Sequence, residues 1–447
     1  MSMPDSVNAG VASLFGDDGP LARADASYLP REGQLRMAEA VARAIGERSS
    51  LVVEAGTGVG KTYAYLVPLL VSGKRGLVST ATKSLQDQLY LRDLPRLVET
   101  LAVPVRMALL KGRASYLCRH RLRQARATAQ LPDRFAVRAL ARVETWAQAT
   151  RTGDMAEIEG LDERSPVIPL VTSTRDNCLG ADCPEYRACH VVQARREAMA
   201  ADLVVVNHHL FFADMALRDS GVAELLPTVD VAIFDEAHQL VDAGVQFLGA
   251  TLSTAQAIDL ARDVLAVGLA QARGLGRWHD LATALEKSTR ELRLACAGGT
   301  ADIRGSRRVR WDDRLGGDDF HGALEALQGA ASEAAAGLSA VAEVGPDFPR
   351  LQQRAAELAA MVERFIRPAG NDHVRWIDIS AQQARLVESP LDIREMLTEQ
   401  RGSGSRAWIF TSATLGDDDR LTWFTESTGL EDAVTLKVSS PFDYPRN

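Results

Sequence analysis

The chain has 447 residues, of which 46% are hydrophobic and 25% are charged, and its formal net charge is −8. This composition is typical of a folded globular protein, and the length predicts about three domains. The negative charge excludes binding of nucleic acid through bulk positive charge, so any such contact requires a local basic patch. No apolar run reaches the roughly 18 residues of a membrane span, and no signal-peptide pattern opens the chain, so we expect a cytoplasmic protein without membrane contact.

Short apolar runs alternate with helical segments along much of the chain. Nearly continuous apolar runs are typical of strands that are covered on both faces. The intervening segments, such as 83–94, have helical character, and this alternation predicts an α/β fold with a mostly parallel sheet. The predicted strands lie at 51–54, 76–80, 105–110, 203–206, 231–235 and 407–411.

Two long segments interrupt the alternation of strands and helices. The first contains most of the cysteines and a basic helical stretch, and the second is rich in alanine at helical spacing. Both are therefore predicted to be insertions into the sheet domain. The predicted parts are a flexible leader (1–27), the first part of the sheet domain (28–110), a cysteine-bearing insertion (111–200), the second part of the sheet domain (201–242), a helical insertion (243–370) and a return to the sheet domain (371–447).

A glycine-rich turn lies between a predicted strand and a predicted helix and reads AGTGVGKT. Its glycines allow the backbone to curl so that N–H groups face phosphates, and the helix N-terminus adds its dipole. Lys61 is expected to meet the β- and γ-phosphates, and Thr62 to bind Mg²⁺. A turn without a ligand would not require GKT at this place. The predicted ATP-binding residues of this loop are Ala55, Gly56, Thr57, Gly58, Val59, Gly60, Lys61 and Thr62.

An acidic pair ends the apolar strand in VAIFDEAHQL. Asp235 is placed to hold the Mg²⁺ shell, and Glu236 to orient and deprotonate the attacking water. An isolated DEAH would be a weak signal, because an acidic surface turn produces the same letters. Downstream of GKT and after four apolar residues, it predicts ATP hydrolysis with Asp235, Glu236 and Lys61 as the catalytic residues.

Four of the five cysteines form a possible metal site with the spacing C-x59-C-x4-C-x5-C. Structural zinc sites usually use paired C-x2-4-C knuckles, often with histidine, so this spacing suits zinc less well. Four thiolates also suit a [4Fe–4S] cluster, and the spacing alone leaves both metals open. The four are Cys118, Cys178, Cys183 and Cys189, whereas Cys296 is read as an ordinary small apolar residue.

The order of the phosphate loop, DEAH and FTSATL (410–415) resembles that of superfamily 2 helicases. Four further stretches narrow the resemblance to the DinG/XPD group of iron–sulfur DNA helicases, nearest its bacterial DinG/YoaA branch. The similarity runs from about residue 14 to the last residue. The four stretches are LLKGRASYLC (109–118), VVNHHLFFAD (205–214), ESPLDI (388–393) and SSPFDYP (439–445).

The resemblance implies a fold and a set of site residues. The fold would be a RecA-like motor domain with an iron–sulfur insertion and a helical arch, and the four cysteines would hold a [4Fe–4S] cluster. Arg31 and Gln34, in YLPREGQ, would read adenine. His238, Ser412 and Thr414 would couple the ATP state to DNA. His208 and His209 would be structural or line the DNA path, rather than bind metal.

The resemblance also implies single-stranded or forked DNA as the partner. In the stretch after the second predicted strand, the candidates for gripping the DNA backbone are Thr82, Lys83 and Gln86. The basic stretch near Cys118 is free of acidic residues and would contact phosphates beside the cluster. Its candidates are Arg113, Arg119, Arg121 and Arg123. A second basic stretch (304–314) is a weaker candidate because acidic residues flank it.

The function implied by the resemblance is that of an ATP-dependent 5′→3′ DNA helicase in DNA repair or replication. Such helicases use a second RecA-like domain whose arginines lie in a Q-x-x-G-R motif, and no such motif occurs in these residues. We therefore expect a truncated chain that is weakly active alone, with a separately encoded second motor domain as one expected partner. The alternative is a non-catalytic regulatory fragment that binds ATP and single-stranded DNA. An RNA helicase of the DEAH type is disfavoured by the cysteines.

Overall fold

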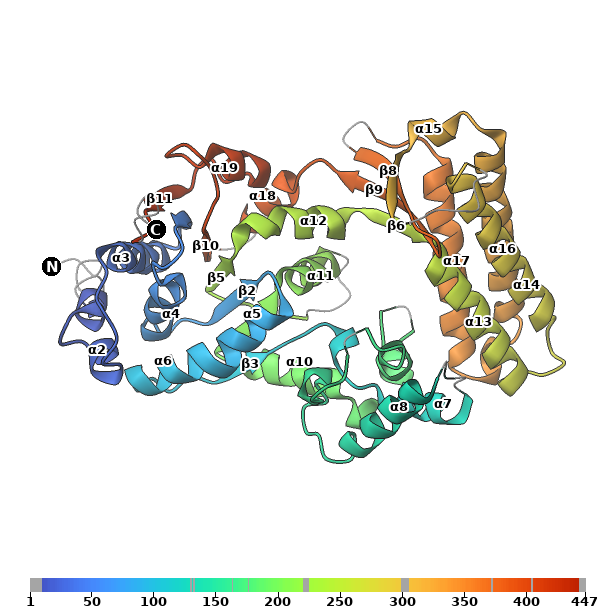
Figure 1. The fold of residues 1–447 in the computed structure, drawn as a ribbon, viewed down its shortest axis with the longest axis horizontal. Helices are drawn as coiled ribbons and strands as arrows, with labels where there is room; N and C mark the ends of the chain where they lie inside the picture. The colour runs from blue at the N-terminus through green and yellow to red at the C-terminus, as the bar shows by residue number, and fades with distance from the viewer. Residues whose placement is uncertain are drawn as a thin grey trace. The chain divides into compact units, whose positions relative to one another are not determined.

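The computed structural model describes residues 10–128, 131, 133–162, 164–175, 177–219, 225–298, 305–370, 373–402 and 405–441. The chain divides into two compact units (Figure 1). Unit 1 comprises 1–112, 190–247 and 392–447, and unit 2 comprises 113–189 and 248–391. Within the described ranges, no helix combines the length and apolar character that crossing a membrane requires.

Unit 1 is built on a seven-stranded sheet in which every pairing is parallel. The strand order is β11-β1-β10-β5-β2-β4-β3, so the chain crosses repeatedly over the sheet faces. All six predicted strands occur in it, and the predicted α/β fold with a parallel sheet is confirmed. The strands are β1 (Ser50–Ala55), β2 (Gly76–Thr80), β3 (Met107–Leu109), β4 (Leu203–Asn207), β5 (Val231–Asp235), β10 (Ala407–Ser412) and β11 (Val434–Val438).

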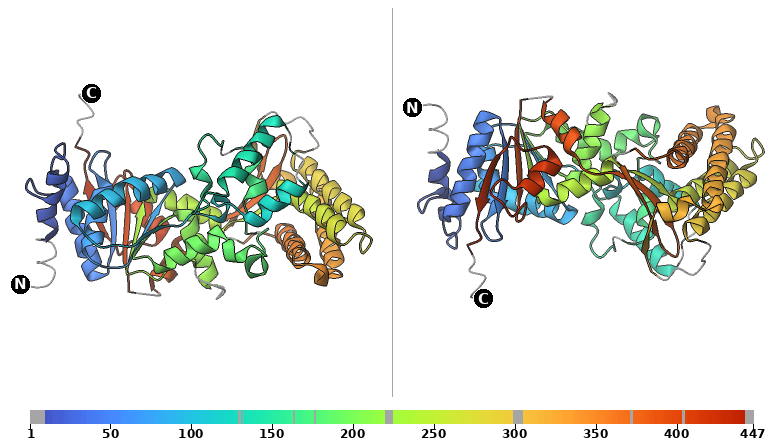
Figure 2. Two further views of the ribbon diagram at one scale, coloured as in Figure 1. Left: turned by 90° about the horizontal axis from the view of Figure 1, so that it is seen from below. Right: turned by 90° about the horizontal axis from the view of Figure 1, so that it is seen from above.

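Helices cover both faces of this sheet (Figure 2). On one face, alternate strand residues such as Val53 and Ile233 join a core with the helices α3 (Glu32–Glu47) and α4 (Lys61–Val71). On the other face, Phe234 stacks on Phe410 with ring centroids 4.9 Å apart and meets Phe211 of α11 (His208–Asp219) edge-on at 4.8 Å. Each fully buried side chain of this kind contributes about 1.5–3 kcal/mol, so both faces are firmly held.

The N-terminal residues of unit 1 differ from the prediction. The flexible leader expected over 1–27 is wrong for its described part, because Val11, Phe15 and Leu21 are buried in the core of unit 1. Residues 1–9 lie outside the described residues. The remaining helices of unit 1 are α2 (Pro20–Ala24), α5 (Lys83–Gln88), η1 (Leu89–Asp93), α6 (Leu94–Leu101), α10 (His190–Ala200), η6 (Ala237–Gln239), α12 (Leu240–Leu248), α18 (Arg394–Gly402) and α19 (Thr422–Thr428).

The larger part of unit 2 combines packed helices with an antiparallel sheet of order β6-β9-β8-β7. The second insertion was predicted to be helical and to end at residue 370. Instead, two strands follow that point and pair with two earlier ones, so unit 2 continues to Leu391. The elements are β6 (Ala250–Ser253), α13 (Thr254–Gln271), α14 (Trp278–Cys296), β7 (Arg307–Arg310), α15 (Asp312–Leu315), α16 (Asp318–Ser339), η7 (Ala342–Val344), α17 (Asp347–Ile366), β8 (His373–Ile379) and β9 (Ala384–Pro390).

A buried ion pair fastens this sheet to α17. The carboxylate of Glu388 accepts hydrogen bonds from Arg364 Nε at 2.7 Å and Arg375 Nε at 2.6 Å. The side chains of Glu388 and Arg375 are only 5% and 4% exposed, and the Arg375 guanidinium also lies over the rings of Trp311 and Phe365. Since an unpaired buried charge is costly, each member of this cluster depends on the others.

The smaller part of unit 2, residues 113–189, holds short helices around its own core of Leu117, Val143, Val167 and Val171. Asp133 caps α8 by accepting hydrogen bonds from two backbone N–H groups at 2.8 Å. The first insertion was predicted to end at residue 200, whereas α10 belongs to unit 1. The elements are η2 (Arg113–Ser115), α7 (Arg119–Thr128), α8 (Arg134–Trp146), η3 (Met155–Glu157), α9 (Ile168–Val171), η4 (Gly180–Asp182) and η5 (Tyr186–Ala188).

Candidate active site

The topology of unit 1 brings three of the predicted motifs to one edge of the sheet. The phosphate-loop motif begins at the last residue of β1, the DEAH sequence at the last residue of β5, and the SAT sequence at the last residue of β10. These strands are neighbours, with Glu54 in register with Ser412 and Thr411 in register with Asp235. Ligands of open parallel sheets bind outside the carboxyl ends of the strands, so this edge is the candidate active site.

The phosphate loop has the backbone that its glycines allow. Gly58 and Gly60 have φ angles of 86° and 87°, in the left-handed region that favours glycine. The helix α4 begins directly at Lys61, so its N-terminal N–H groups and dipole face the loop. The Lys61 ammonium donates to the carbonyl of Ala55 at 3.3 Å, which keeps it over the loop.

The residues predicted to read adenine pack against the phosphate loop. Gln34 is 4% exposed and donates from Nε2 to the Gly60 carbonyl at 3.0 Å, while Arg31 donates to the Gly58 carbonyl. Tyr28 donates its hydroxyl to Gln34 Oε1 at 3.1 Å, a contact that the sequence did not indicate. A Cβ on Gly60 would lie 2.2 Å from Gln34 Nε2, so only glycine permits this approach.

Asp235 is a buried carboxylate that is partnered on both oxygens. Tyr65 on α4 donates its hydroxyl to Oδ2 at 3.0 Å, and the Glu236 backbone N–H donates to Oδ1 at 3.0 Å. Burial, together with the neighbouring charge of Glu236, raises the pKa of Asp235 to about 6. Burial and then the charge of Asp235 hold the pKa of Tyr65 well above its usual value, so its hydroxyl stays a donor. Apart from its place on the helix, nothing in the sequence marked Tyr65.

Glu236 and the SAT serine are joined through a histidine. Glu236 has a φ of 53°, a left-handed conformation that is costly for a residue with a side chain and is found mainly at functional sites. His238 Nδ1 lies 2.7 Å from Ser412 Oγ and 3.4 Å from Glu236 Oε2, and Ser412 Oγ lies 3.4 Å from the same Glu236 oxygen. The structure therefore brings these three together, while Thr414 is exposed beyond the strand.

The segment after β11 lies against the phosphate loop, which the sequence did not predict. The Gly56 N–H donates to the Val438 carbonyl at 3.0 Å, and Ser440 donates its hydroxyl to the Thr57 carbonyl at 2.8 Å. A Cβ on Gly56 would lie 2.7 Å from the Ser440 backbone nitrogen. Residues 442–445 of the SSPFDYP stretch lie outside the described residues.

The four cysteines of the predicted metal site share one neighbourhood in unit 2. All four are half-buried free thiols; Cys118 directly precedes α7, Cys183 follows η4 and Cys189 follows η5. Burial, and then the neighbouring Cys118, Cys178 and Cys189, raise the pKa of Cys183 to about 11. The described residues contain no three Cys, His, Asp or Glu side chains gathered as a ready single-ion site.

A bound cationic centre would reverse this electrostatic preference, because metal coordination stabilises thiolates. The donor set of four sulfur atoms from one unit therefore fits an iron–sulfur group chemically. Cys296 belongs elsewhere: it is fully buried in the helical core of unit 2, where burial raises its pKa to about 12.

The residues predicted to grip DNA in unit 1 occupy different environments. Lys83 is exposed, and Thr82 caps α5 by accepting the Leu85 N–H at 3.2 Å. Gln86 is fully buried and donates to the Leu110 carbonyl at 3.3 Å, so here it holds α5 in place rather than facing solvent. His208 is likewise buried, with Nδ1 2.7 Å from Ser79 Oγ, and burial lowers its pKa to about 3, which leaves it neutral.

The arginines of unit 2 that were predicted to contact DNA lie on or near α7. They differ in whether partners within the protein already bind their guanidinium groups. Arg123 forms an ion pair with Glu185, which offsets its charge. Arg121 donates to the Pro169 carbonyl at 3.4 Å, and both it and Arg119 keep a buried Nε without a hydrogen-bond partner among the described residues. Arg113 is half-buried on η2.

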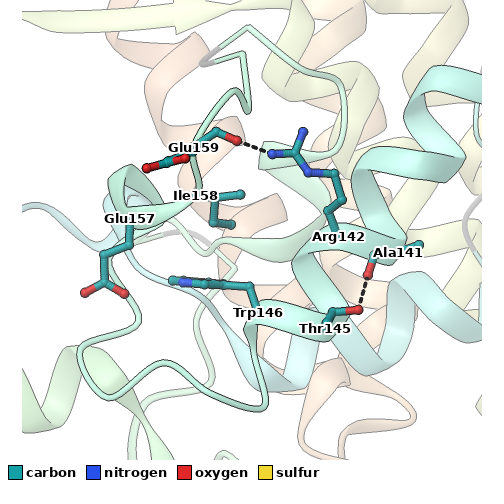
Figure 3. A pocket seen from close by; sticks show the side chains of 7 residues that line it. All are labelled: Ala141, Arg142, Thr145, Trp146, Glu157, Ile158 and Glu159. Atoms are coloured by element: carbon teal, nitrogen blue, oxygen red, sulfur yellow. Dashed lines mark hydrogen bonds between the residues drawn. The ribbon is translucent and has the colours of Figure 1, made fainter.

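A hollow of about 540 Å³ lies within unit 2, between α8 and the residues around η3 (Figure 3). Its Arg142 guanidinium donates to the Glu159 carbonyl, and the Glu157 carboxylate accepts from the Thr150 hydroxyl at 2.9 Å. Trp146 forms one wall. None of the residues that line this hollow belongs to a predicted motif.

Comparison with known proteins agrees with the motifs. A family model described as DEAD/DEAH box helicase matches residues 34–149. The chain is 39% identical over 435 residues to the ATP-dependent DNA helicase YoaA of Haemophilus influenzae and 41% identical over 437 residues to that of Escherichia coli. Each alignment covers 97% of this chain and 67% of the relative, so the chain spans about two thirds of their length.

Two further similarities are more distant. The ATP-dependent helicase DinG of Mycobacterium tuberculosis is 36% identical over 335 residues, covering 70% of this chain and 45% of the relative. A solved structure of a truncated XPD covers 90% of this chain and 98% of its own chain, with a TM-score of 0.44 and 15% identity.

Proposed function

The chain belongs to the DinG/XPD-like family of DEAD/DEAH-box helicases, and from this premise we propose that it is the ATP-driven motor of a DNA helicase. The observation that carries the proposal is the meeting of three motifs at one sheet edge. The phosphate loop after β1, the Asp235–Glu236 pair after β5 and Ser412 at the end of β10 lie on adjacent strands.

Each residue of this edge has a role in the proposed cycle. Lys61 binds the β- and γ-phosphates, and Thr62 and Asp235 hold the Mg²⁺ shell. Glu236 orients and deprotonates the attacking water. The remaining predicted residues frame this chemistry: Gln34 and Arg31 read adenine from beside the loop, and His238 passes the state of Glu236 to Ser412.

Two substitutions test the nucleotide chemistry. Lys61→Ala should abolish binding of a fluorescent ATP analogue with Mg²⁺, because the phosphates lose their cation. Glu236→Gln should keep that binding within about twofold and lower hydrolysis by roughly two to four orders of magnitude, the usual contribution of a general base. Unchanged hydrolysis in Glu236→Gln would remove Glu236 from the catalytic role.

We also propose that Cys118, Cys178, Cys183 and Cys189 hold a [4Fe–4S] cluster. When bound, the cluster would supply iron–thiolate bonds that tie the start of α7 to the segment 178–189. Their chemical fit and mutual electrostatic influence support this proposal. Anaerobically purified protein should contain about four irons and four sulfides per chain, Cys118→Ser should lose them, and Cys296→Ser should keep them. Stoichiometric zinc in a colourless protein would instead assign a zinc site.

The DNA partner and the direction of movement are part of the same proposal. We propose that single-stranded or forked DNA binds and is followed 5′→3′, in repair or replication, with Lys83 and the arginines of α7 contacting phosphates. Binding should weaken steeply between 50 and 200 mM salt, as phosphate contacts do. A comparison of forks with only a 5′ or only a 3′ single-stranded arm tests the direction.

Turnover by these 447 residues alone is proposed to be slow. Arginines supplied by a second motor domain are worth on the order of 10³–10⁵ in turnover, and no Q-x-x-G-R motif occurs in this sequence. Adding a second motor domain as a separate polypeptide should then raise DNA-stimulated hydrolysis. The alternative function is a regulator that binds ATP and single-stranded DNA without catalysis. Glu236 and Lys61 disfavour it, and hydrolysis that stays absent with the added domain would support it.

A further inference from the structure

Resting on the ATP-dependent function proposed above, we propose that Glu54 is a positioning residue that links the phosphate loop to the loop after β10. We call residues 413–421 the SAT loop. Glu54 is the penultimate residue of β1 and directly precedes Ala55, where the phosphate-loop motif begins. Its side chain reaches the SAT loop rather than the nucleotide site, so its effect would be transmitted through that loop.

The carboxylate of Glu54 holds the first amides of the SAT loop. Oε2 accepts hydrogen bonds from the backbone N–H groups of Leu415 at 2.6 Å and Gly416 at 3.1 Å. The strand register explains this reach, because Glu54 pairs with Ser412 on one side and Lys437 on the other. The side chain is only 17% exposed, so water competes little with these charge-assisted hydrogen bonds.

Lys437, on the neighbouring strand β11, is hydrogen-bonded to the same loop. Its ammonium lies 3.3 Å from Glu54 Oε1 and donates to the carbonyls of Gly416 and Asp417 at 3.1 and 3.2 Å. A third carbonyl, that of Asp418, lies at 3.4 Å. Glu54 therefore accepts hydrogen bonds from N–H groups of the SAT loop, and Lys437 donates hydrogen bonds to its carbonyls. The ion pair between Glu54 and Lys437 joins the two sets of contacts.

The backbone of the SAT loop is tightly constrained. A Cβ on Gly416 would lie 3.0 Å from the Leu421 Cα, so the backbone at Gly416 closely approaches the last residue of the loop. Leu421 has a left-handed φ of 53° although it carries a side chain, and both it and Leu415 are fully buried. A backbone this constrained has few ways to absorb a displacement locally, so movement of Glu54 would shift the whole loop.

This contact gives the site a second connection besides the one through the DEAH histidine. Ser412, three residues before Leu415, already contacts His238 and lies 3.4 Å from Glu236 Oε2. The first residue of the SAT sequence, Ser412, thus contacts the DEAH residues, and the backbone just after the SAT sequence is hydrogen-bonded to Glu54. A change in the phosphate loop on nucleotide binding reaches it through Glu54 even when Glu236 does not move.

Hydrogen–deuterium exchange on the whole chain, with and without a saturating non-hydrolysable ATP analogue and Mg²⁺, tests this role. Glu54→Gln removes the charge at nearly constant volume, and Lys437→Met removes the opposing ammonium. Thr435→Val is the matched control, because the Thr435 hydroxyl donates to the Asp419 carbonyl of the same loop at 3.0 Å without touching Glu54.

We expect the wild-type SAT loop to change its exchange when the nucleotide binds. In Glu54→Gln, exchange at residues 415 and 416 should be at least about tenfold faster, since a hydrogen bond to a charged group shifts local opening by that factor or more. The nucleotide Kd should stay within about twofold, but the loop should no longer respond. Lys437→Met should weaken the response and Thr435→Val should preserve it.

The outcomes separate this proposal from the one on which it rests. A wild-type chain that binds no nucleotide would overturn the ATP-dependent function, and the role of Glu54 with it. Binding in both proteins with an intact loop response in Glu54→Gln would overturn the positioning role alone. Loss of the response in Thr435→Val as well would show that any loosening of the loop has this effect, which also refutes a specific role for Glu54.

Discussion

The hydrogen bond from Tyr65 to Asp235 predicts how Mg²⁺ binding depends on pH. Asp235 has a pKa of about 6 in the fold, raised from 3.8 by burial and by the charge of Glu236. The raised value means that the fold favours the protonated acid. As the proposed holder of the Mg²⁺ shell, Asp235 must lose a proton to bind Mg²⁺ below pH 6, and the Mg²⁺ affinity should fall as the pH decreases through that value. Nucleotide binding should require more Mg²⁺ at pH 5 than at pH 7 by about tenfold.

Tyr65→Phe removes the hydroxyl, which is 3.0 Å from Asp235 Oδ2 and stabilises its charged form. A hydrogen bond to a charged group is worth about 1.5 kcal/mol or more, which corresponds to roughly one pKa unit. The midpoint of the pH profile should therefore move from about 6 toward neutrality, to higher pH. At pH 6 the variant should bind Mg²⁺ about fivefold more weakly, and above pH 8.5 the two proteins should agree.

The assay is a Mg²⁺ titration of fluorescent ATP-analogue binding at a series of pH values. Tyr63→Phe is the control, because Tyr63 lies on the same helix and is only half-buried. An identical midpoint in wild type and Tyr65→Phe would refute the reasoning. A loss of affinity that is the same at every pH would also refute it, because it would show a packing defect rather than a change in the ionisation of Asp235.

Three further predictions concern stability and reactivity. Gly60→Ala should lower the free energy of unfolding by at least about 1–2 kcal/mol, because of its left-handed φ, and should abolish ATP-analogue binding. Gly46→Ala, in α3 with open space at its Cβ, should instead raise the free energy of unfolding in urea by about 0.5–1 kcal/mol. Glu388→Gln should destabilise unit 2 by about 3–5 kcal/mol, because the buried Arg375 loses its counter-ion. Burial raises the pKa of Glu388, but hydrogen bonds from its two arginines outweigh this effect and hold the pKa below 4.5. The stability that this ion pair contributes is therefore present above pH 4.5 and lost as the pH falls further. Glu388→Gln should remove that acid sensitivity in thermal unfolding. Cys296 should resist alkylation in the native protein and react only once unit 2 unfolds, as mass spectrometry of labelled peptides would show.

The sequence predicted the parts of the site that follow from local backbone and strand chemistry. Phosphate loops need glycine at left-handed positions, and Gly58 and Gly60 occupy them. The strand that ends in Asp235 is recognisable from its apolar run alone, because parallel strands are covered on both faces. The four cysteines could be grouped because cysteine is otherwise scarce in this chain.

The parts that could not be predicted depend on partners that are distant in the sequence. Tyr65 meets Asp235 across 170 residues, and Glu54 meets Leu415 across 361. Tyrosine on a buried helix is read as core, and glutamate before a glycine-rich turn is read as a strand end. The antiparallel strands of unit 2 were missed because sequences such as HVRWIDI alternate weakly and follow a helical stretch.

The missed contacts share a physical logic that explains why motif residues are insufficient to describe the site. Lys61, Asp235 and Glu236 are charged, and their charges act only if neighbouring groups set their ionisation and position. In this structure that setting comes from groups on other elements. Tyr65 of α4 donates to Asp235 at the end of β5, and His238 contacts both Glu236 and Ser412 at the end of β10. Since these partners come from different elements, no single motif contains the groups that set its own chemistry.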